Sequence, residues 1–185
     1  MDVELKAFAE ELARDIEDGI SSGEGEPWSE HEFTRQVLDR LGEAGAVENP
    51  QPLPQGGAGR FGRSEYSISG FSVPDDEDPE RIVIFTTLYR GEGPDRKLAA
   101  GELKTAATLA ARFVLASFRG LHSRIEPSNT EASDLAYRLM TLKDRIHTVR
   151  IAILSDCSND RIVKETVSDS VRFAVDVYDI EALHR

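Results

Sequence analysis

The sequence predicts a three-layer α/β fold in which helices flank a central mixed β-sheet of about four strands. Two observations support this fold class. Segments with apolar residues at steps of three and four, as in helices, alternate along the chain with β-branched and aromatic segments. The expected element order is α-α-β-β-α-α-β-(α)-β-α, and 185 residues are enough for one compact domain with a normal core.

Composition and charge exclude several classes of protein. The net charge of −12 is concentrated in residues 1–50, which hold 14 acidic and 4 basic residues, whereas the remainder is nearly neutral. This distribution lacks the basic footprint of a dedicated nucleic-acid binder. The sequence has no run of 18 apolar residues and begins with polar residues, so neither a membrane span nor a secretory signal is predicted. The single cysteine, Cys157, excludes an internal disulfide and predicts a cytoplasmic location.

Residues 1–48 are predicted to form a pair of helices packed on the core. The apolar stripe of the first helix recurs at steps of three and four residues and consists of Leu5, Phe8, Leu12, Ile16 and Ile20. Ser29 and Glu32 fit a capping box at the start of the second helix. Trp28 and Phe33 occupy the hydrophobic-staple positions around that box.

A loop separates this helical pair from the α/β core. Residues 49–64 are rich in proline, glycine and glutamine and are predicted to form a flexible loop. The core is expected to cover residues 60–185. Its first strand is predicted at residues 65–73, where Gly70 allows a bulge. Its second strand, residues 81–89, is β-branched and aromatic throughout, as expected of a buried central strand.

The second half of the chain predicts two helices, two strands and the start of a last helix. The longest helix, residues 103–121, has an alanine-rich face that allows close approach to a sheet, and a further helix follows Pro127. Strands are predicted at residues 148–154 and 173–177. The sequence stops one turn after Asp179, and so short a helix is unstable alone, which indicates a fragment or a domain cut at a boundary.

Several short motifs of this core, in this order, resemble the N-terminal domain of abortive-infection phage-resistance proteins of the AIPR type. The motifs are Ile68-Ser-Gly-Phe71, Ile82-Val-Ile-Phe85, the alanine-rich helix, Ile151-Ala-Ile-Leu154 with a following Ser-Asp loop, and Val177-Tyr-Asp-Ile-Glu-Ala-Leu-His-Arg185. The resemblance implies a restriction-endonuclease-like fold. It also implies a bacterial protein that triggers growth arrest or death on phage infection.

The resemblance further implies a nuclease centre that this chain has lost. The family's first strand resembles Ile-Asp-Gly-Tyr, whose Asp binds a metal ion, and Ser69 stands at that position. The next strand of such a nuclease needs Glu-x-Lys, whereas this chain has Thr86 and Thr87. Because magnesium binds through carboxylate oxygens, these hydroxyls would hold it poorly. The expected function is therefore a catalytically degenerate, nuclease-like scaffold, sensor or docking module. It would have no metal or other cofactor, and would bind the remainder of a longer protein or another protein.

An active metal-dependent nuclease with a shifted acidic site is the alternative. Glu65, Asp75, Asp76 or Glu102 would supply carboxylate ligands for Mg²⁺ or Mn²⁺, and Lys97 or Lys104 would orient water or stabilise charge. The even spacing of Glu65 and Ser69 places both on one face of the predicted strand. Residues 75–78 are all acidic, but the prolines on either side of them favour a solvated turn.

A third hypothesis is a pure protein-interaction module that uses the acidic helical pair as its contact surface. Nucleic-acid contact, if it occurs, is expected at Arg60, Arg63 and Arg90, although the acidic turn interrupts this set. Cys157 is expected to be a structural thiol because no histidine lies at a diagnostic offset from it. No contact with a membrane is expected.

Overall fold

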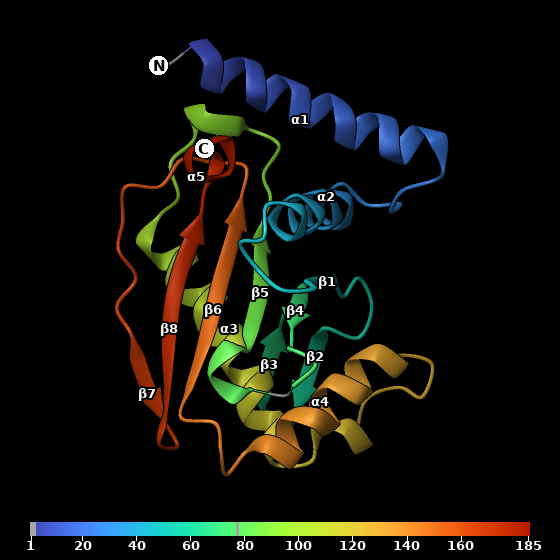
Figure 1. Ribbon diagram of the computed structural model, residues 1–185, viewed down its shortest axis with the longest axis vertical. Helices are drawn as coiled ribbons and strands as arrows, with labels where there is room; N and C mark the ends of the chain where they lie inside the picture. The colour runs from blue at the N-terminus through green and yellow to red at the C-terminus, as the bar shows by residue number, and fades with distance from the viewer. Residues whose placement is uncertain (1–2, 77) are drawn as a thin grey trace.

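The computed structural model describes residues 3–76 and 78–185 and confirms an α/β fold around a mixed sheet (Figure 1). The sheet has six strands rather than about four. Their spatial order is β1 (Gln51–Pro52), β4 (Gly70–Ser72), β5 (Val83–Leu88), β6 (Thr148–Ser155), β8 (Val171–Tyr178) and β7 (Thr166–Ser168). The pairs β5–β6 and β6–β8 are parallel, and the other neighbouring strands are antiparallel.

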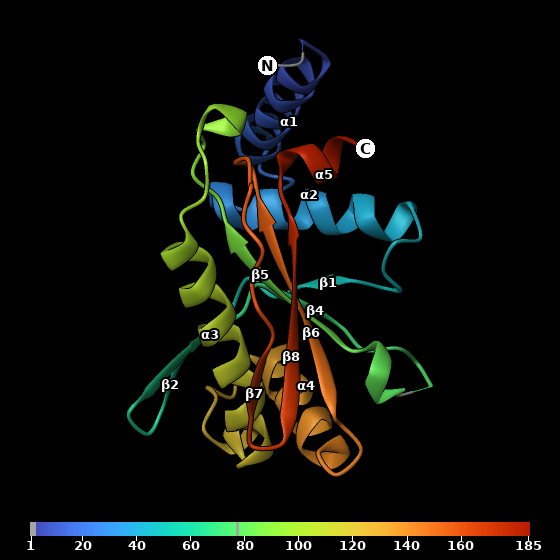
Figure 2. The same ribbon diagram turned by 90° about the vertical axis from the view of Figure 1, so that its left-hand side faces the viewer.

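Helices bury both faces of this sheet. They are α1 (Val3–Ser22), α2 (Ser29–Glu43), α3 (Ala100–Phe118), α4 (Thr130–Leu142) and α5 (Ile180–His184). Apolar side chains of α3 and α4 pack with Ile84 and Ile151, whereas those of α1, α2 and α5 pack with Phe85 and Leu154. Neighbouring residues of a strand point to opposite faces, so β5 contributes to both clusters. Figure 2 shows α3 running along the sheet and α2 running across the strands.

The predicted strand 65–73 is two strands that belong to different sheets. β3 (Ser64–Ser67) pairs with β2 (Ala58–Phe61) in a separate hairpin, which projects from the molecule beside α3 (Figure 2). The chain then crosses into the central sheet as β4. Tyr66 packs its ring against Phe113 of α3, with 5.4 Å between the ring centroids, and so fixes the hairpin to the body. The predicted common strand face of Glu65 and Ser69 is therefore absent.

Two further segments differ from the prediction. Residues 49–64 contain β1 and β2, where a flexible loop was expected. The sequence predicted a helix between the strands that form β6 and β8. The structure instead has a segment without regular secondary structure and the short edge strand β7, whose residues are all exposed. Three 3₁₀ turns complete the fold: η1 (Pro79–Arg81), η2 (Gly93–Asp95) and η3 (Leu121–Ser123). None of the helices that the structure describes is both long and apolar enough to cross a membrane.

The capping box predicted at the start of α2 does not form. Trp28 is the N-cap residue, makes no side-chain cap bond and is 67% exposed, so the hydrophobic staple is also absent. Glu32 is instead fully buried. Its carboxylate accepts hydrogen bonds from the Glu26 N–H (2.8 Å), from Arg35 Nη2 (2.6 Å) and Nε (3.0 Å), and from Gln36 Nε2 (2.7 Å). Glu32 thus ties the α1–α2 connection to α2.

Candidate functional site

Two of the sequence-predicted positions meet beside the end of β5. Ser69 lies between β3 and β4, and its hydroxyl shares a 2.8 Å hydrogen bond with the hydroxyl of Thr87. Thr87 Oγ1 shares a second 2.8 Å hydrogen bond with Thr34 Oγ1 of α2. Thr34 Oγ1 also donates to the Glu30 carbonyl oxygen at 2.7 Å. The structure therefore brings Ser69 and Thr87 together, but as part of a chain of neutral hydroxyl groups.

Thr86, the third of these positions, lies on the other side of β5. It lines a pocket of about 370 Å³ between the end of β5 and the start of α3, which we call the β5–α3 pocket. Thr87, Arg90, Glu102 and Thr105 line the same pocket, although the Thr87 hydroxyl bonds to Ser69 and Thr34. Among the described residues, Glu102 is the one acidic residue in this lining. The pocket therefore offers hydroxyl groups and a single carboxylate.

That carboxylate already has cationic partners. Glu102 Oε1 accepts hydrogen bonds from Arg90 Nη2 at 2.9 Å and from Arg96 Nη2 at 3.0 Å, and Oε2 accepts one from the Ala99 N–H at 3.0 Å. The bond from the Ala99 N–H and the one from Arg90 hold the pKa of Glu102 below its ordinary value. Glu102 is thus ionised at neutral pH, neutralised by two guanidinium groups, and committed to closing the start of α3.

Asp156 fixes the loop that carries Arg90. Its carboxylate accepts hydrogen bonds from three backbone N–H groups: Arg90 at 2.8 Å, Glu92 at 3.0 Å and Gly93 at 3.2 Å. Asp156 is 5% exposed and directly follows β6, the central parallel strand. Sequence reasoning noted the Ser-Asp loop but missed this role. The available signal was an acidic residue immediately after a buried strand.

The residues of the alternative acidic site do not converge. Glu65 is exposed, pairs with Arg60 at 2.7 Å and lies in the projecting hairpin. Lys97 pairs with Asp160 at 2.8 Å on another part of the surface, and Lys104 lines a different pocket from Glu102. Among the described residues, no three His, Cys, Asp or Glu side chains are grouped so that they could hold a metal ion.

The described residues of the acidic turn, 74–76 and 78–79, do not line the β5–α3 pocket. Asp75 and Asp76 are exposed, and Asp76 pairs with Arg81 at 3.3 Å. Glu77, which the sequence includes in the same acidic run, lies outside the described residues. The described acidic residues of this turn accept local bonds, such as the one from the Asp78 N–H to Asp76 Oδ1 at 3.1 Å. This arrangement is that of a solvated turn.

The three arginines expected to contact nucleic acid are only partly brought together. Arg60 and Arg90 line adjacent pockets that share Ser67 and Leu109. Each is paired with an acid, Arg60 with Glu65 and Arg90 with Glu102. Arg63 is exposed in the turn between β2 and β3. These pairs leave little unneutralised positive charge along this surface.

Cys157 is fully buried behind β6. Burial, together with the neighbouring charge of Asp156, raises the pKa of its thiol to about 11. The Sγ–Oδ1 distance between these two residues is 3.6 Å. A thiol that is neutral at physiological pH is a poor nucleophile, so Cys157 acts as part of the core.

Comparison with known proteins identifies a family for this chain. Residues 33–185 match the sequence profile of the abortive infection phage resistance protein N-terminal domain. The matched region begins in α2 and contains all six strands of the central sheet. No curated protein and no solved structure matches the chain. Because the match covers most of the sequence, the chain belongs to the family of the abortive infection phage resistance protein N-terminal domain.

Proposed function

We propose that this chain is a catalytically degenerate, nuclease-like domain with a restriction-endonuclease-like fold. In an abortive-infection phage-resistance protein it serves as a scaffold, sensor or docking module rather than as the hydrolytic centre. One observation carries the proposal: Ser69 and Thr87 place hydroxyl groups 2.8 Å apart where the family-like nuclease pattern calls for a metal-binding carboxylate and the Glu-x-Lys strand.

The chemistry of the available groups supports this proposal. Hydrolysis of a phosphodiester by a metal-dependent nuclease needs carboxylate oxygens that hold Mg²⁺ or Mn²⁺ and activate water. Neutral hydroxyl groups are weak ligands for these ions, and those of Ser69 and Thr87 are already bonded to each other. Glu102 would have to release Arg90 and Arg96 before it could coordinate a cation. Among the residues that the structure describes, no three His, Cys, Asp or Glu side chains are grouped so that they could take over the role of such acids.

The partner of such a module is proposed to be the remainder of a longer protein or a second protein of the bacterial cytoplasm. The face formed by α1 and α2 favours a protein over a nucleic acid. Residues 1–50 hold 14 acidic and 4 basic residues, and this charge repels a phosphate backbone. The apolar sides of both helices are already buried, with Phe33 and Ile16 among their least exposed residues. A partner would therefore meet a mainly polar, negatively charged surface that also exposes Val3 and Trp28.

A cleavage assay tests the proposal. The protein is incubated with supercoiled plasmid, and separately with RNA, in buffers that contain Mg²⁺ or Mn²⁺. We expect neither substrate to be cleaved above the level of a no-protein control. Glu102→Gln and Glu65→Ala variants, purified in parallel, identify any contaminating nuclease, because its activity would be the same in all three preparations. Metal-dependent cleavage that disappears in either variant would show an active site and contradict the proposal.

A further inference from the structure

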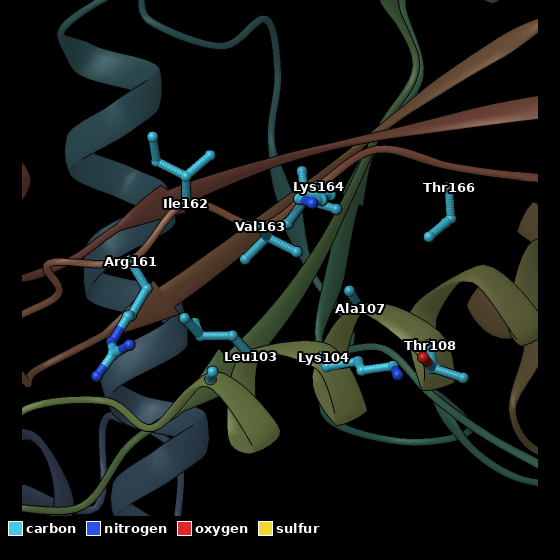
Figure 3. A pocket seen from close by; sticks show the side chains of 11 residues that line it. Leu103, Lys104, Ala107, Thr108, Arg161, Ile162, Val163, Lys164 and Thr166 are labelled. Carbon is cyan, nitrogen blue, oxygen red and sulfur yellow. The ribbon is translucent and has the colours of Figure 1, made fainter.

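A second pocket lies on the other side of α3 from the β5–α3 pocket. It has a volume of about 400 Å³ and lies between the first half of α3 and the segment 161–166, with Val175 of β8 beneath them. We call it the α3–β8 pocket. Figure 3 shows Leu103 and Lys104 of α3 on one side of the pocket and Val163 and Lys164 on the other.

The interior of the α3–β8 pocket is apolar. Leu103 is fully buried, and Ala107, Val163 and Val175 are half-buried and pack against the same core cluster. Ile162 lies at the rim and is 94% exposed, the highest value among the large apolar residues that are exposed. Cavities of this size with mainly apolar walls are the usual form of small-molecule sites in proteins.

The rim of the pocket carries positive charge without a matching acid. Lys104 and Lys164 both line it, and neither ammonium group makes an ion pair with any described residue. Arg161 adds a third cation, which pairs with Asp160 at 3.2 Å. In a chain with a net charge of −12, two lysines that line one pocket and lack acidic partners produce a local positive potential, which attracts an anion.

One wall of the pocket is held mainly at its two ends. The stretch 159–165 has no regular secondary structure. At its start the Asn159 N–H donates to Asp179 Oδ2 at 2.8 Å, and at its other end the chain enters β7. Between its ends the stretch is held by the packing of Val163 and by the exposed ion pair of Asp160 with Lys97, and an outward shift breaks no strand pairing, so it costs less than the displacement of a strand. A ligand could therefore enter between Val163 and α3 without disturbing the sheet.

We propose that the α3–β8 pocket binds a small amphiphilic anion. The apolar body of the ligand lies against Leu103, Ala107 and Val175, and its carboxylate or phosphate group lies between the ammonium groups of Lys104 and Lys164. This proposal does not depend on the absence of nuclease activity. The two observations behind it are the apolar cavity and the pair of unneutralised lysines at its mouth.

A fluorescence titration with 8-anilinonaphthalene-1-sulfonate tests the proposal, because this probe combines an apolar body with one negative charge. We expect saturable binding of one probe per folded chain. In the Lys104→Ala/Lys164→Ala double variant the dissociation constant should rise about tenfold, as two partly exposed charge contacts are lost. Lys143→Ala, which removes an exposed lysine at the end of α4, is the matched control and should bind the probe as the unmodified chain does.

Competition and a blocked pocket make the test specific. Decanoate and decyl phosphate should displace the probe, and their relative affinities distinguish a carboxylate ligand from a phosphate ligand. Decylammonium, with the same apolar body and the opposite charge, should not displace it. Ala107→Phe fills the pocket floor and should abolish binding while the circular dichroism spectrum stays unchanged. No saturable binding to the unmodified chain, equal affinity in the double variant, or equal displacement by decylammonium would each overturn the proposal.

Discussion

Asp156→Ala is expected to lower the free energy of unfolding by about 3 to 5 kcal/mol, because three backbone N–H groups lose a charged acceptor that is itself almost fully buried. The loop that carries Arg90 should become mobile, and Arg90 should lose its fixed position beside Glu102. Urea unfolding at neutral pH, followed by circular dichroism, measures the change.

Two further variants show whether the carboxylate itself is responsible. Asp156→Asn keeps the size of the side chain but presents an amide NH₂ group to part of the N–H cluster. Its free energy of unfolding should therefore lie between those of the unmodified chain and the alanine variant. Asp160→Ala removes an exposed acid four residues after Asp156, in the segment that follows β6, and should leave the urea midpoint unchanged. If Asp156→Ala and Asp160→Ala have equal midpoints, Asp156 does not anchor the loop.

Glu32→Ala is the second substitution with a large expected effect, about 3 kcal/mol of stability. It leaves the Glu26 N–H without its acceptor and Arg35 without its closest partner. The chain is built closely around this carboxylate. A Cβ atom added at Gly19 would lie 2.4 Å from Glu32 Oε1, and one added at Gly25 would lie 2.5 Å from Oε2. Urea unfolding measures the loss, and Glu30→Ala, on the exposed side of the same turn, is the control.

The effect of Glu32 should depend on pH. Burial alone would raise its pKa, but hydrogen bonds from Arg35, the Glu26 N–H and Gln36 outweigh burial and hold the pKa below its ordinary value of 4.5. A carboxyl group with a lowered pKa stabilises the fold above that ordinary value, and the contribution is lost as the pH falls through the folded-state pKa. The stability difference between the unmodified chain and Glu32→Gln should therefore shrink between pH 6 and pH 3. A difference that does not change with pH would show that the Glu32 charge is not involved.

The elements that sequence reasoning located are those whose pattern depends on burial. α1 and α3 have long apolar stripes, and β5 and β6 are buried almost throughout. The pattern of apolar residues in these elements therefore reflects their burial in the core. The short strands β1 and β7 have no such apolar pattern. β1 has two residues and β7 is fully exposed, and both exist because a neighbouring strand supplies hydrogen bonds. Pairing of this kind is a tertiary property.

Local patterns also failed where other hydrogen-bond partners compete for the same group or segment. Ser29 and Glu32 have capping-box spacing, but Glu32 binds Arg35 and the α1–α2 connection instead. The alternation from Tyr66 to Val73 looks continuous, yet the chain changes sheets near Ser69. In the first case nearby donors replace the capping box, and in the second the pairing of β3 with β2 and of β4 with β5 replaces the continuous strand.

The candidate site was predictable in part. The resemblance placed Ser69 and Thr87 in one centre, and the structure brings their hydroxyl groups into contact. The resemblance did not distinguish Thr86 from Thr87. Neighbouring side chains of a strand point to opposite faces, so Thr86 faces α3, whereas the Thr87 hydroxyl bonds to Thr34 of α2. Asp156 fixes Arg90 because the loop after β5 passes close to the end of β6. Spacing along the chain does not contain this information.

Calorimetric titration of the protein with Mn²⁺ tests the central claim most directly, since Mn²⁺ binds to the carboxylate sites that serve nucleases. The arrangement of Ser69, Thr87 and the arginine-bound Glu102 predicts no stoichiometric binding of the ion. Binding of one Mn²⁺ per chain that is lost in Glu102→Gln would contradict the account, because it would show that this carboxylate leaves its arginines to form a metal centre.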